Sequence, residues 1–431
     1  MERAIFKTLD NWKLSANRKP LILNGARQVG KTWTLKEFGV RAYRDLVYVN
    51  CDNNPALNDV FWDYDTTRLL RAFSALSNKR IEPGKTLIVL DEIQENPKAL
   101  TSLKYFCENA PDYHIAAAGS LLGVEMHQGS GFPVGKVDEL YLYPMTFREF
   151  LKAVNETVLL DILSNRQWDV LKSVRSKCIE LLRQYYYTGG MPEVVKCYVQ
   201  THDLIEVRKI QNRILSQYRM DFGKHIPTGM IPKVGMVWDA IPSQLSRENK
   251  KFIYSTIKKG ARAKDYEDAI QWLINARLVY KVNRVNKILQ PLKFYEDITS
   301  FKLFVNDLGL LGAMADVPAK SILLGTNVFT EYKGAFTEQY VAQQLIASGN
   351  KPFYYTNEKS TVEIDFIIQT DTIHPIEVKA EENLRSKSLK TIVDNHDGLT
   401  GWRFSMADYR EQEWLVNVPL YAIEDWVEEC E

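Results

Sequence analysis

Short apolar runs alternate with longer segments of helical period over the first third of the chain. The apolar runs, which predict strands, cover residues 21–23, 46–50, 86–90, 114–118 and 137–142. Between them, hydrophobic positions recur with the spacing of helices, as over residues 57–76 and 97–109. Strands that alternate with helices predict a parallel sheet with right-handed crossovers. We therefore expect an α/β domain over residues 20–150.

Helical spacing dominates the middle of the chain. Residues 152–222 have the apolar positions of helices with one buried face, as at residues 178–182. Gly189-Gly190 interrupts this pattern, and Pro192 is suited to the start of the next helix. A helix, a second helix and a strand, the order of a winged helix, are then predicted over residues 249–256, 263–275 and 278–285.

The last third of the chain contains a helix followed by two strands. Residues 333–346 predict an amphipathic helix, and residues 362–368 and 375–380 predict strands that a turn joins into a hairpin. Because side chains alternate along a strand, Glu377 and Lys379 share one face of the second strand.

Composition narrows the class of protein. The chain has 431 residues, more than one compact core holds, which predicts about two to four domains. Its 45% hydrophobic and 25% charged residues are typical of a soluble globular protein. The five cysteines are scattered without a C-x-x-C pair, which favours a reducing compartment. No segment has the apolar length of a signal peptide or of a membrane span of about 18 residues, so we expect a cytoplasmic protein without a membrane partner.

Positive charge is concentrated in one part of the chain. The net charge is only +1, but residues 205–290 contain 17 Lys and Arg against 7 Asp and Glu. A basic winged helix is a DNA-binding module, so DNA is a candidate partner. Its second helix, however, carries Asp265, Glu267 and Asp268 near its start, and these acids repel phosphate. A solvated basic face explains the excess equally well, and both interpretations stay open.

The segment Gly25-Ala26-Arg27-Gln28-Val29-Gly30-Lys31-Thr32 fits the phosphate-binding pattern G-x-x-x-x-G-K-[ST] between a strand and a helix. Gly25 and Gly30 let backbone N–H groups approach phosphate oxygens, which a Cβ would hinder. The helix that begins near Lys31 directs its positive end at the same anion. We expect Lys31 to reach the β- and γ-phosphates of a nucleotide and the Thr32 hydroxyl to hold Mg²⁺.

Two carboxylates follow the apolar strand over residues 86–90. The carboxyl end of a parallel strand faces the ligand crevice. Asp91 is therefore placed to bind Mg²⁺, directly or through water, and Glu92 to polarise the attacking water. Gly119-Ser120 ends another strand, where Ser120 either senses the γ-phosphate or the attacking water, or makes a turn. Together, these residues predict a site that hydrolyses nucleotides.

Several segments together resemble a bacterial and archaeal family of AAA-type ATPases. The likeness includes residues 25–32, 87–92 and 119–120, and two segments that are more specific to the family. These two are Leu142-Tyr143-Pro144-Met145-Thr146-Phe147-Arg148-Glu149-Phe150-Leu151 and Tyr187-Thr188-Gly189-Gly190-Met191-Pro192-Glu193. The resemblance implies an ATPase core, a helical lid with a Gly-Gly-x-Pro signature near the nucleotide, a winged-helix joint, and ATP as ligand. A plain turn between two helices explains Gly189-Gly190 equally well.

The C-terminal segment resembles the core of restriction-endonuclease-type nucleases, whose pattern is a helical Glu, an Asp and then Glu-x-Lys. Here the pattern falls on Glu338, Asp365, Glu377 and Lys379, which we expect to be catalytic. Asp365 and Glu377 would hold Mg²⁺, and Lys379 would orient or activate water. Relatives of the ATPase family carry a similar domain of unknown function, and a fold kept for DNA binding or packing is the alternative.

These predictions combine into an α/β protein of four parts. A P-loop parallel-sheet ATPase core (residues 1–152) precedes a helical lid (153–235), a winged-helix-like joint (236–290) and a restriction-endonuclease-like domain (291–431). We expect Mg²⁺-dependent ATP hydrolysis, coupled to action on DNA. A nucleotide-gated DNA-binding or protein-binding switch without nuclease activity is the alternative. Arg213, Arg219 or a neighbouring subunit of an oligomer are the candidate sources of an arginine finger.

Overall fold

The computed structural model describes residues 1–119, 132–247, 250–324, 327–359, 361–380, 386–396 and 398–430. Contacts between Cα atoms divide the chain into two compact units. The first unit comprises residues 1–143 and 275–277, and the second comprises residues 144–274 and 278–431. The domain boundary that we predicted at residue 152 therefore falls inside the second unit. Across the described ranges, no helix combines the length and apolar character that crossing a membrane requires.

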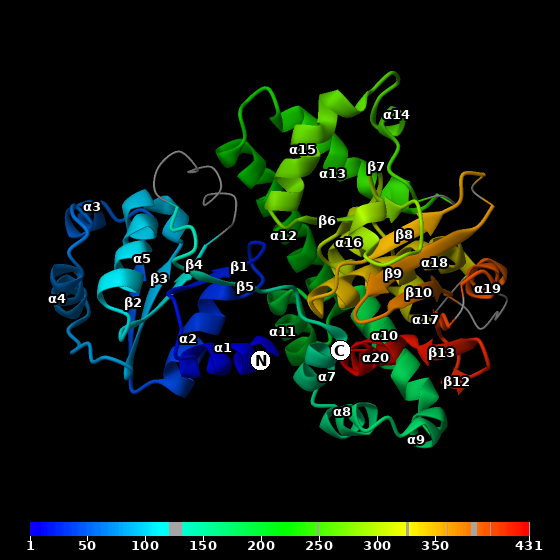
Figure 1. The fold of residues 1–431 in the computed structure, drawn as a ribbon, viewed down its shortest axis with the longest axis horizontal. Coiled ribbons are helices and arrows are strands. Elements are labelled where there is room, and N and C mark those ends of the chain that lie inside the picture. Colours follow the sequence, from blue (N-terminus) through cyan, green and yellow to red (C-terminus); the bar gives the residue numbers. More distant parts are fainter. Residues whose placement is uncertain are drawn as a thin grey trace. The chain divides into compact units, whose positions relative to one another are not determined.

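A five-stranded parallel sheet organises the first unit (Figure 1). Its order is β2-β3-β4-β1-β5, which confirms the predicted α/β class. The strands are β1 (Leu21–Asn24), β2 (Asp45–Asn50), β3 (Thr86–Asp91), β4 (His114–Ala118) and β5 (Asp138–Tyr141). The helices are α1 (Ile5–Leu14), α2 (Lys31–Ala42), α3 (Ala56–Val60), α4 (Thr66–Ser77) and α5 (Pro97–Asn109), with a 3₁₀ turn η1 (Ile93–Glu95).

The central strands of this sheet are buried along their whole length. Every residue of β1, β3 and β4 is buried, as expected for strands that helices cover on both faces. In the sheet, Leu23 of β1 pairs with Ala118 of β4, and Leu90 of β3 pairs with Ala117. The carboxyl ends of these three strands therefore lie at the same edge of the sheet, which is the edge where parallel sheets bind their ligands.

An eight-stranded mixed sheet organises the second unit, in the order β12-β13-β11-β10-β9-β8-β6-β7. β6 pairs with β7 in antiparallel fashion and with β8 in parallel, so the sheet includes strands from both sides of residue 290. The boundary predicted between residues 290 and 291 therefore divides a single sheet. The strands are β6 (Val279–Val285), β7 (Glu296–Val305), β8 (Phe353–Thr356), β9 (Glu363–Gln369), β10 (Ile373–Val378), β11 (Gly401–Ser405), β12 (Arg410–Glu411) and β13 (Leu415–Pro419).

Helices make up most of the second unit before this sheet. The helical prediction for residues 152–222 is confirmed by α8 (Thr157–Ser164), α9 (Trp168–Ser173), α10 (Arg175–Thr188), α11 (Pro192–Thr201) and α12 (Leu204–His225). The remaining helices are α7 (Phe147–Ala153), α13 (Ile231–Leu245), α14 (Tyr254–Ile257), α15 (Ala263–Asn275), α16 (Leu308–Met314), α17 (Ala319–Leu324), α18 (Asn327–Ala347), α19 (Lys387–Asp394) and α20 (Ile423–Cys430), with 3₁₀ turns η2 (Leu292–Tyr295) and η3 (Leu420–Ala422).

The helix that we predicted over residues 249–256 is wrong for most of its described length. Only α14, which begins at Tyr254, is helical there. Before it, the chain runs extended, because the Phe252 N–H donates to the Phe301 carbonyl at 2.8 Å and the two rings stack 5.5 Å apart. Tertiary pairing with β7 thus replaces local helix formation.

The Gly189-Gly190 turn packs against the residue that caps α16. An added Cβ would lie 2.2 Å from Asp307 Oδ1 at Gly189 and 2.0 Å from the Met145 carbonyl oxygen at Gly190. The Gly190 N–H donates to Asp307 Oδ2 at 2.6 Å, and the Leu310 N–H donates to Asp307 Oδ1 at 3.0 Å. Both glycines are therefore needed for a close approach of three chain segments within the second unit.

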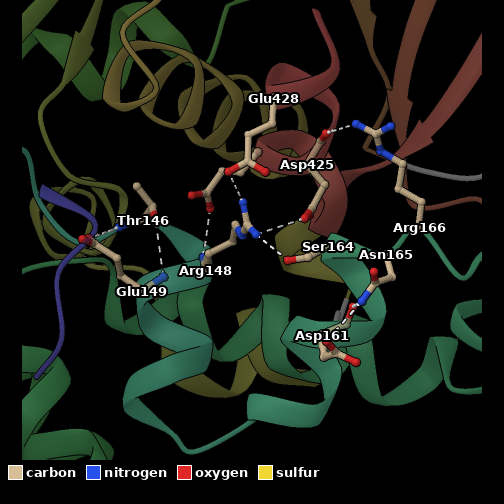
Figure 2. Close-up of polar contacts among 10 residues, drawn as sticks. Thr146, Arg148, Glu149, Asp161, Ser164, Asn165, Arg166, Asp425 and Glu428 are labelled. Carbon is tan, nitrogen blue, oxygen red and sulfur yellow. Dashed lines mark hydrogen bonds and ion pairs between the residues drawn. The ribbon is translucent and has the colours of Figure 1, made fainter. Parts of the chain in front are cut away.

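The C-terminal helix α20 is held to α7 through Arg148 (Figure 2). The Arg148 N–H donates to Glu424 Oε1 at 2.9 Å, and its guanidinium lies 2.5 Å from Glu428 Oε1 and 3.5 Å from Asp425 Oδ1. Thr146 and Glu149 form a capping box that begins α7 (Figure 2). Within the segment that resembles the ATPase family, Arg148 therefore joins α7 to α20 inside the second unit.

Candidate functional site

The phosphate-binding loop has the local structure that its sequence predicts. It connects the end of β1 at Asn24 to the start of α2 at Lys31. Gly30 adopts a positive φ of 95°, and an added Cβ on Gly25 would lie 2.3 Å from the Leu142 carbonyl oxygen. Because L-residues rarely adopt such a φ and no side chain fits beside Leu142, both glycines are structural requirements of the loop.

Lys31 folds back over this loop. Its Nζ donates to the carbonyl oxygens of Gly25 at 3.0 Å and Ala26 at 2.8 Å. Burial lowers the pKa of Lys31 to about 8, and the negative charges of Glu92 and Asp91 oppose this shift. A dianionic or trianionic phosphate in the loop would favour the charged ammonium, as these carboxylates do.

Thr32, in the first turn of α2, contacts Asp91, at the end of β3. The Thr32 hydroxyl lies 3.0 Å from Asp91 Oδ1 and 2.9 Å from Oδ2. Asp91 is only 4% exposed. A hydroxyl and a carboxylate at this spacing form an oxygen donor set, which is the set that Mg²⁺ prefers, so these residues fit the expected ion.

Tyr48 is a member of this group that sequence reasoning missed. Its hydroxyl donates to Asp91 Oδ2 at 2.7 Å, and Lys36 Nζ lies 3.5 Å from the centre of its ring. Burial and the bond to Asp91 raise the pKa of Tyr48, so the hydroxyl keeps its proton as a donor. The sequence placed Tyr48 on a predicted strand, but only the pairing of β2 with β3 brings its side chain to Asp91.

Glu92 follows Asp91 in a left-handed backbone conformation, with φ of 48°. Its Oε2 accepts a hydrogen bond from Gln94 Nε2 at 2.5 Å, and Gln94 is 4% exposed. Gln94 is a second residue that the sequence did not single out. The carboxylate is thus held in a defined place beside the residues that the sequence assigns to the nucleotide. Ser120, which we predicted at the end of β4, lies outside the described residues.

The C-terminal hairpin brings together three of its four predicted catalytic residues. β9 and β10 pair in antiparallel fashion with Ile376 opposite Phe366, and the same register places Glu377 opposite Asp365. Asp365 Oδ2 accepts the Val378 N–H at 2.8 Å, and Lys379 Nζ lies 2.7 Å from Glu377 Oε1. Glu377 Oε2 is buried and accepts no hydrogen bond from the described residues.

Glu338, the fourth predicted residue, lies between two lysines. It is 4% exposed on α18, and its Oε1 pairs with Lys250 Nζ. Its Oε2 lies 3.5 Å from Nζ of Lys302, a β7 residue with no exposed side-chain surface. Lys302 also lies 2.9 Å from Glu363 Oε1. Sequence reasoning missed both lysines, although a lysine inside the apolar run Phe301-Lys302-Leu303-Phe304 signals a buried, paired charge.

The electrostatics of this acidic group follow from its burial. Burial, and then the negative charge of Glu338, raise the pKa of Asp365 to about 7. The lysines lower the pKa of Glu338 by favouring its charged form, although burial opposes them. Within the described ranges, no three His, Cys, Asp or Glu side chains come together as a metal-binding group. An ion here would therefore rely on the two hairpin carboxylates, whose unpartnered Glu377 oxygen suits a divalent cation.

The remaining candidates of the sequence lie on the helices of the second unit. Arg213 and Arg219 of α12 form ion pairs with Glu193, at 2.5 Å, and with Asp239. On α15, Glu267 and Asp268 are exposed, so the acids that disfavour phosphate contact face solvent.

Three family models match separate parts of the chain. Residues 17–151 match the model described as AAA domain. Residues 179–321 and 333–421 match two models described as domains of unknown function, DUF8612 and DUF4143. No curated protein matches the chain.

Solved structures show distant likenesses. A Walker-type ATPase of Pyrococcus abyssi is 14% identical with a TM-score of 0.45, over 72% of this chain and 94% of that one. A RuvB variant of Thermotoga maritima is 14% identical with a TM-score of 0.31, over 64% and 88%. Cdc6p from Pyrobaculum aerophilum is 11% identical with a TM-score of 0.25, over 74% and 93%. At these values the likenesses carry no functional argument.

Two observations on the first unit agree. The AAA domain model matches the segment that contains the loop, β3 and β4. The loop itself has the glycine conformations, the buried lysine and the paired Thr32 and Asp91 that phosphate binding requires. Residues 17–151 match an AAA domain model, and they contain a P-loop built on a parallel sheet.

Proposed function

We propose that this protein binds ATP and hydrolyses it in a Mg²⁺-dependent reaction at the loop of residues 25–32, Asp91 and Glu92. The observation that supports this best is the approach of Thr32 Oγ1 to both oxygens of Asp91, at 2.9 and 3.0 Å, one residue beyond Lys31. A strand-end carboxylate and the hydroxyl of a phosphate-binding loop are the two protein groups that hold Mg²⁺ in P-loop ATPases.

Each residue of this site has a separate role in binding the nucleotide and its metal ion. The Lys31 ammonium exchanges the neutral carbonyls of Gly25 and Ala26 for phosphate oxygens, and the N-terminus of α2 favours the same negative charge. Thr32 and Asp91 hold the ion, with Tyr48 fixing the Asp91 carboxylate. A bound Mg²⁺ would supply neutralisation of charge on the β- and γ-phosphates.

Glu92 orients the water that attacks the γ-phosphorus. Its carboxylate accepts a hydrogen bond from the water, whose oxygen forms the new bond as the bond from the γ-phosphorus to the bridging oxygen breaks. The water proton passes to the carboxylate or to the phosphate that forms, and ADP leaves. Lys31 and the phosphate-binding loop balance the charge on the leaving group.

Replacing Glu92 by Gln tests this assignment. We expect unchanged ATP binding by a fluorescent analogue, but hydrolysis reduced by about a hundredfold or more, because the amide cannot accept the proton. Glu95→Gln, three residues away and exposed on η1, is the matched control and should leave both unchanged. Full hydrolysis by Glu92→Gln would refute the role of Glu92. A nucleotide-gated switch instead predicts that the ATP-locked Glu92→Gln protein stays biologically active.

A second candidate function is metal-dependent cleavage of DNA by the C-terminal hairpin. The observation that favours it is the gathering of Asp365, Glu377 and Lys379, with one buried Glu377 oxygen that no described group satisfies. Asp365 and Glu377 would hold a divalent ion, which would polarise a phosphodiester, and Lys379 would orient the attacking water. The basic segment of residues 205–290 supports DNA as the substrate.

Cleavage of plasmid and linear DNA, with Mg²⁺ or Mn²⁺ and with or without ATP, tests this second function. Lys379→Ala should abolish cleavage while ATP hydrolysis continues, because the two sites use different residues. Lys387→Ala, an exposed lysine at the start of α19, is the matched control. Cleavage that survives Lys379→Ala, or no cleavage by the wild-type protein under any of these conditions, would contradict the assignment.

A further inference from the structure

The acidic group of the second unit contains its own buried cation. Lys302 lies in the middle of β7 with no exposed side-chain surface, and its Nζ lies 4.9 Å from the centre of the Tyr354 ring. The ammonium is 2.9 Å from Glu363 Oε1 and 3.5 Å from Glu338 Oε2. A fully buried lysine persists only when carboxylates compensate its charge, so Lys302 and these acids form one unit.

Both oxygens of Glu338 are occupied. Lys302 approaches one of them, and Lys250, whose side chain is 14% exposed, pairs with the other. The segment that carries Lys250 is held to β7 two residues further on, where the backbone N–H of Phe252 donates to the Phe301 carbonyl. A divalent ion bound to Glu338 would have to displace one ammonium group and remain beside the other, which like-charge repulsion in a buried site opposes.

Unlike Glu338, neither hairpin carboxylate has a lysine ammonium on both of its oxygens. Asp365 receives one backbone hydrogen bond, through Oδ2, and Glu377 pairs with Lys379 through Oε1 only. The Oε2 oxygen of Glu377 is buried and receives none from the described residues. The oxygens suited to an ion therefore lie on the hairpin, and the α18 carboxylate belongs to the lysine cluster.

We propose that Lys302 is a fixed internal cation that takes the place of a metal ion beside Glu338. The centre then binds at most one divalent ion, through Asp365 and Glu377, and Glu338 is a positioning residue that orients Lys302 and joins α18 to β7. This inference refines the sequence prediction, which counted Glu338 among the catalytic residues. The metal-binding half of the proposal, that one ion binds through Asp365 and Glu377, rests on the proposed DNA-cleaving function. The charge-pairing half, that Lys302 is the partner of Glu338, does not.

Mn²⁺ binding to the full-length chain tests the metal-binding half. All proteins carry Asp91→Asn, so that the ATPase site loses the carboxylate assigned to its metal ion, and binding is followed by calorimetry without nucleotide. We expect Glu377→Gln and Asp365→Asn to weaken Mn²⁺ binding by about tenfold or more, because each removes a ligand. Glu338→Gln should leave the affinity and the stoichiometry of one ion unchanged. Glu338→Gln that weakens binding as much as Glu377→Gln would overturn the proposal.

A double-mutant cycle on thermal unfolding tests the charge-pairing half independently. Lys302→Met and Glu338→Gln should each lower the melting temperature. The double variant should lose clearly less than the sum of the two, because neither Lys302 nor Glu338 then remains to face the loss of the other, whereas Glu363 and Lys250 lose the same partners as in the single variants. Additive losses would overturn the assignment of Lys302. If the protein that carries Asp91→Asn alone binds no Mn²⁺, the DNA-cleaving function fails, and this cycle still decides whether Lys302 is the partner of Glu338.

Discussion

Replacing Arg148 by Met should destabilise the second unit far more at pH 8.5 than at pH 5. Arg148 is paired with α20: its guanidinium lies 3.5 Å from Oδ1 of the buried Asp425, and its backbone N–H bonds to the partly buried Glu424 (Figure 2). Burial raises the pKa of Glu424 to about 7 and the pKa of Asp425 to about 6. Both acids are therefore largely neutral at pH 5 and ionised at pH 8.5, where they need a counter-charge.

The size of the effect follows from these pKa values. An acid whose pKa rises on folding stabilises the folded state below its unfolded pKa, and this contribution is lost as pH rises through the folded pKa. For Glu424, whose ordinary value is 4.5, the rise corresponds to about 3 kcal/mol, and Asp425 contributes a similar amount. Loss of Arg148 then lowers the free energy of unfolding by about 3–5 kcal/mol more at pH 8.5, because the ionised acids lose their partner. At pH 5 only the exposed pair with Glu428 and hydrogen bonds are lost, at about 1 kcal/mol.

Differential scanning calorimetry at the two pH values measures this difference. We expect Arg148→Met to lower the melting temperature of the second unit by about 10 °C at pH 8.5 and about 3 °C at pH 5. Lys177→Met, which removes an exposed pair with Glu156, is the control and should have a small effect at both. Adding Asp425→Asn to Arg148→Met should restore part of the stability at pH 8.5. Equal losses at both pH values would refute the reasoning.

Two further predictions concern the remaining contacts of each unit. Tyr48→Phe should raise the Mg²⁺ concentration needed for half-maximal ATP hydrolysis and lower kcat by about tenfold, because Asp91 loses one of its two hydroxyl donors; an unchanged Mg²⁺ titration would exclude this role. Gly190→Ala should prevent folding or lower the melting temperature by about 10 °C or more, since the new Cβ would lie 2.0 Å from the Met145 carbonyl oxygen. Gly223→Ala, where nothing lies within 4 Å of the added Cβ, is its control, and equal melting of the two variants would contradict the packing argument.

Local patterns predicted the elements of the first unit well. The predicted helix over residues 97–109 and the predicted strand over 114–118 coincide with α5 and β4. Asn96 caps α5 by accepting the Ala99 N–H, and Pro97 occupies its first turn, so the signals that begin this helix lie in adjacent residues. The helix predicted over residues 249–256 failed because Phe252 pairs with β7, and no local pattern records that partner.

The same contrast separates the two candidate sites. The phosphate-binding loop is encoded by eight consecutive residues, whose glycines, lysine and threonine act where the chain places them. The sequence by itself therefore determined this loop, the strand-end carboxylates and the α/β class. Only the tertiary structure decided that Tyr48 reaches Asp91 and that Lys302 and Lys250 neutralise Glu338, because these contacts join residues 43, 36 and 88 positions apart. The free energy of a buried charge depends on which groups surround it, and burial is set by the packing of strands and helices that the local pattern does not specify.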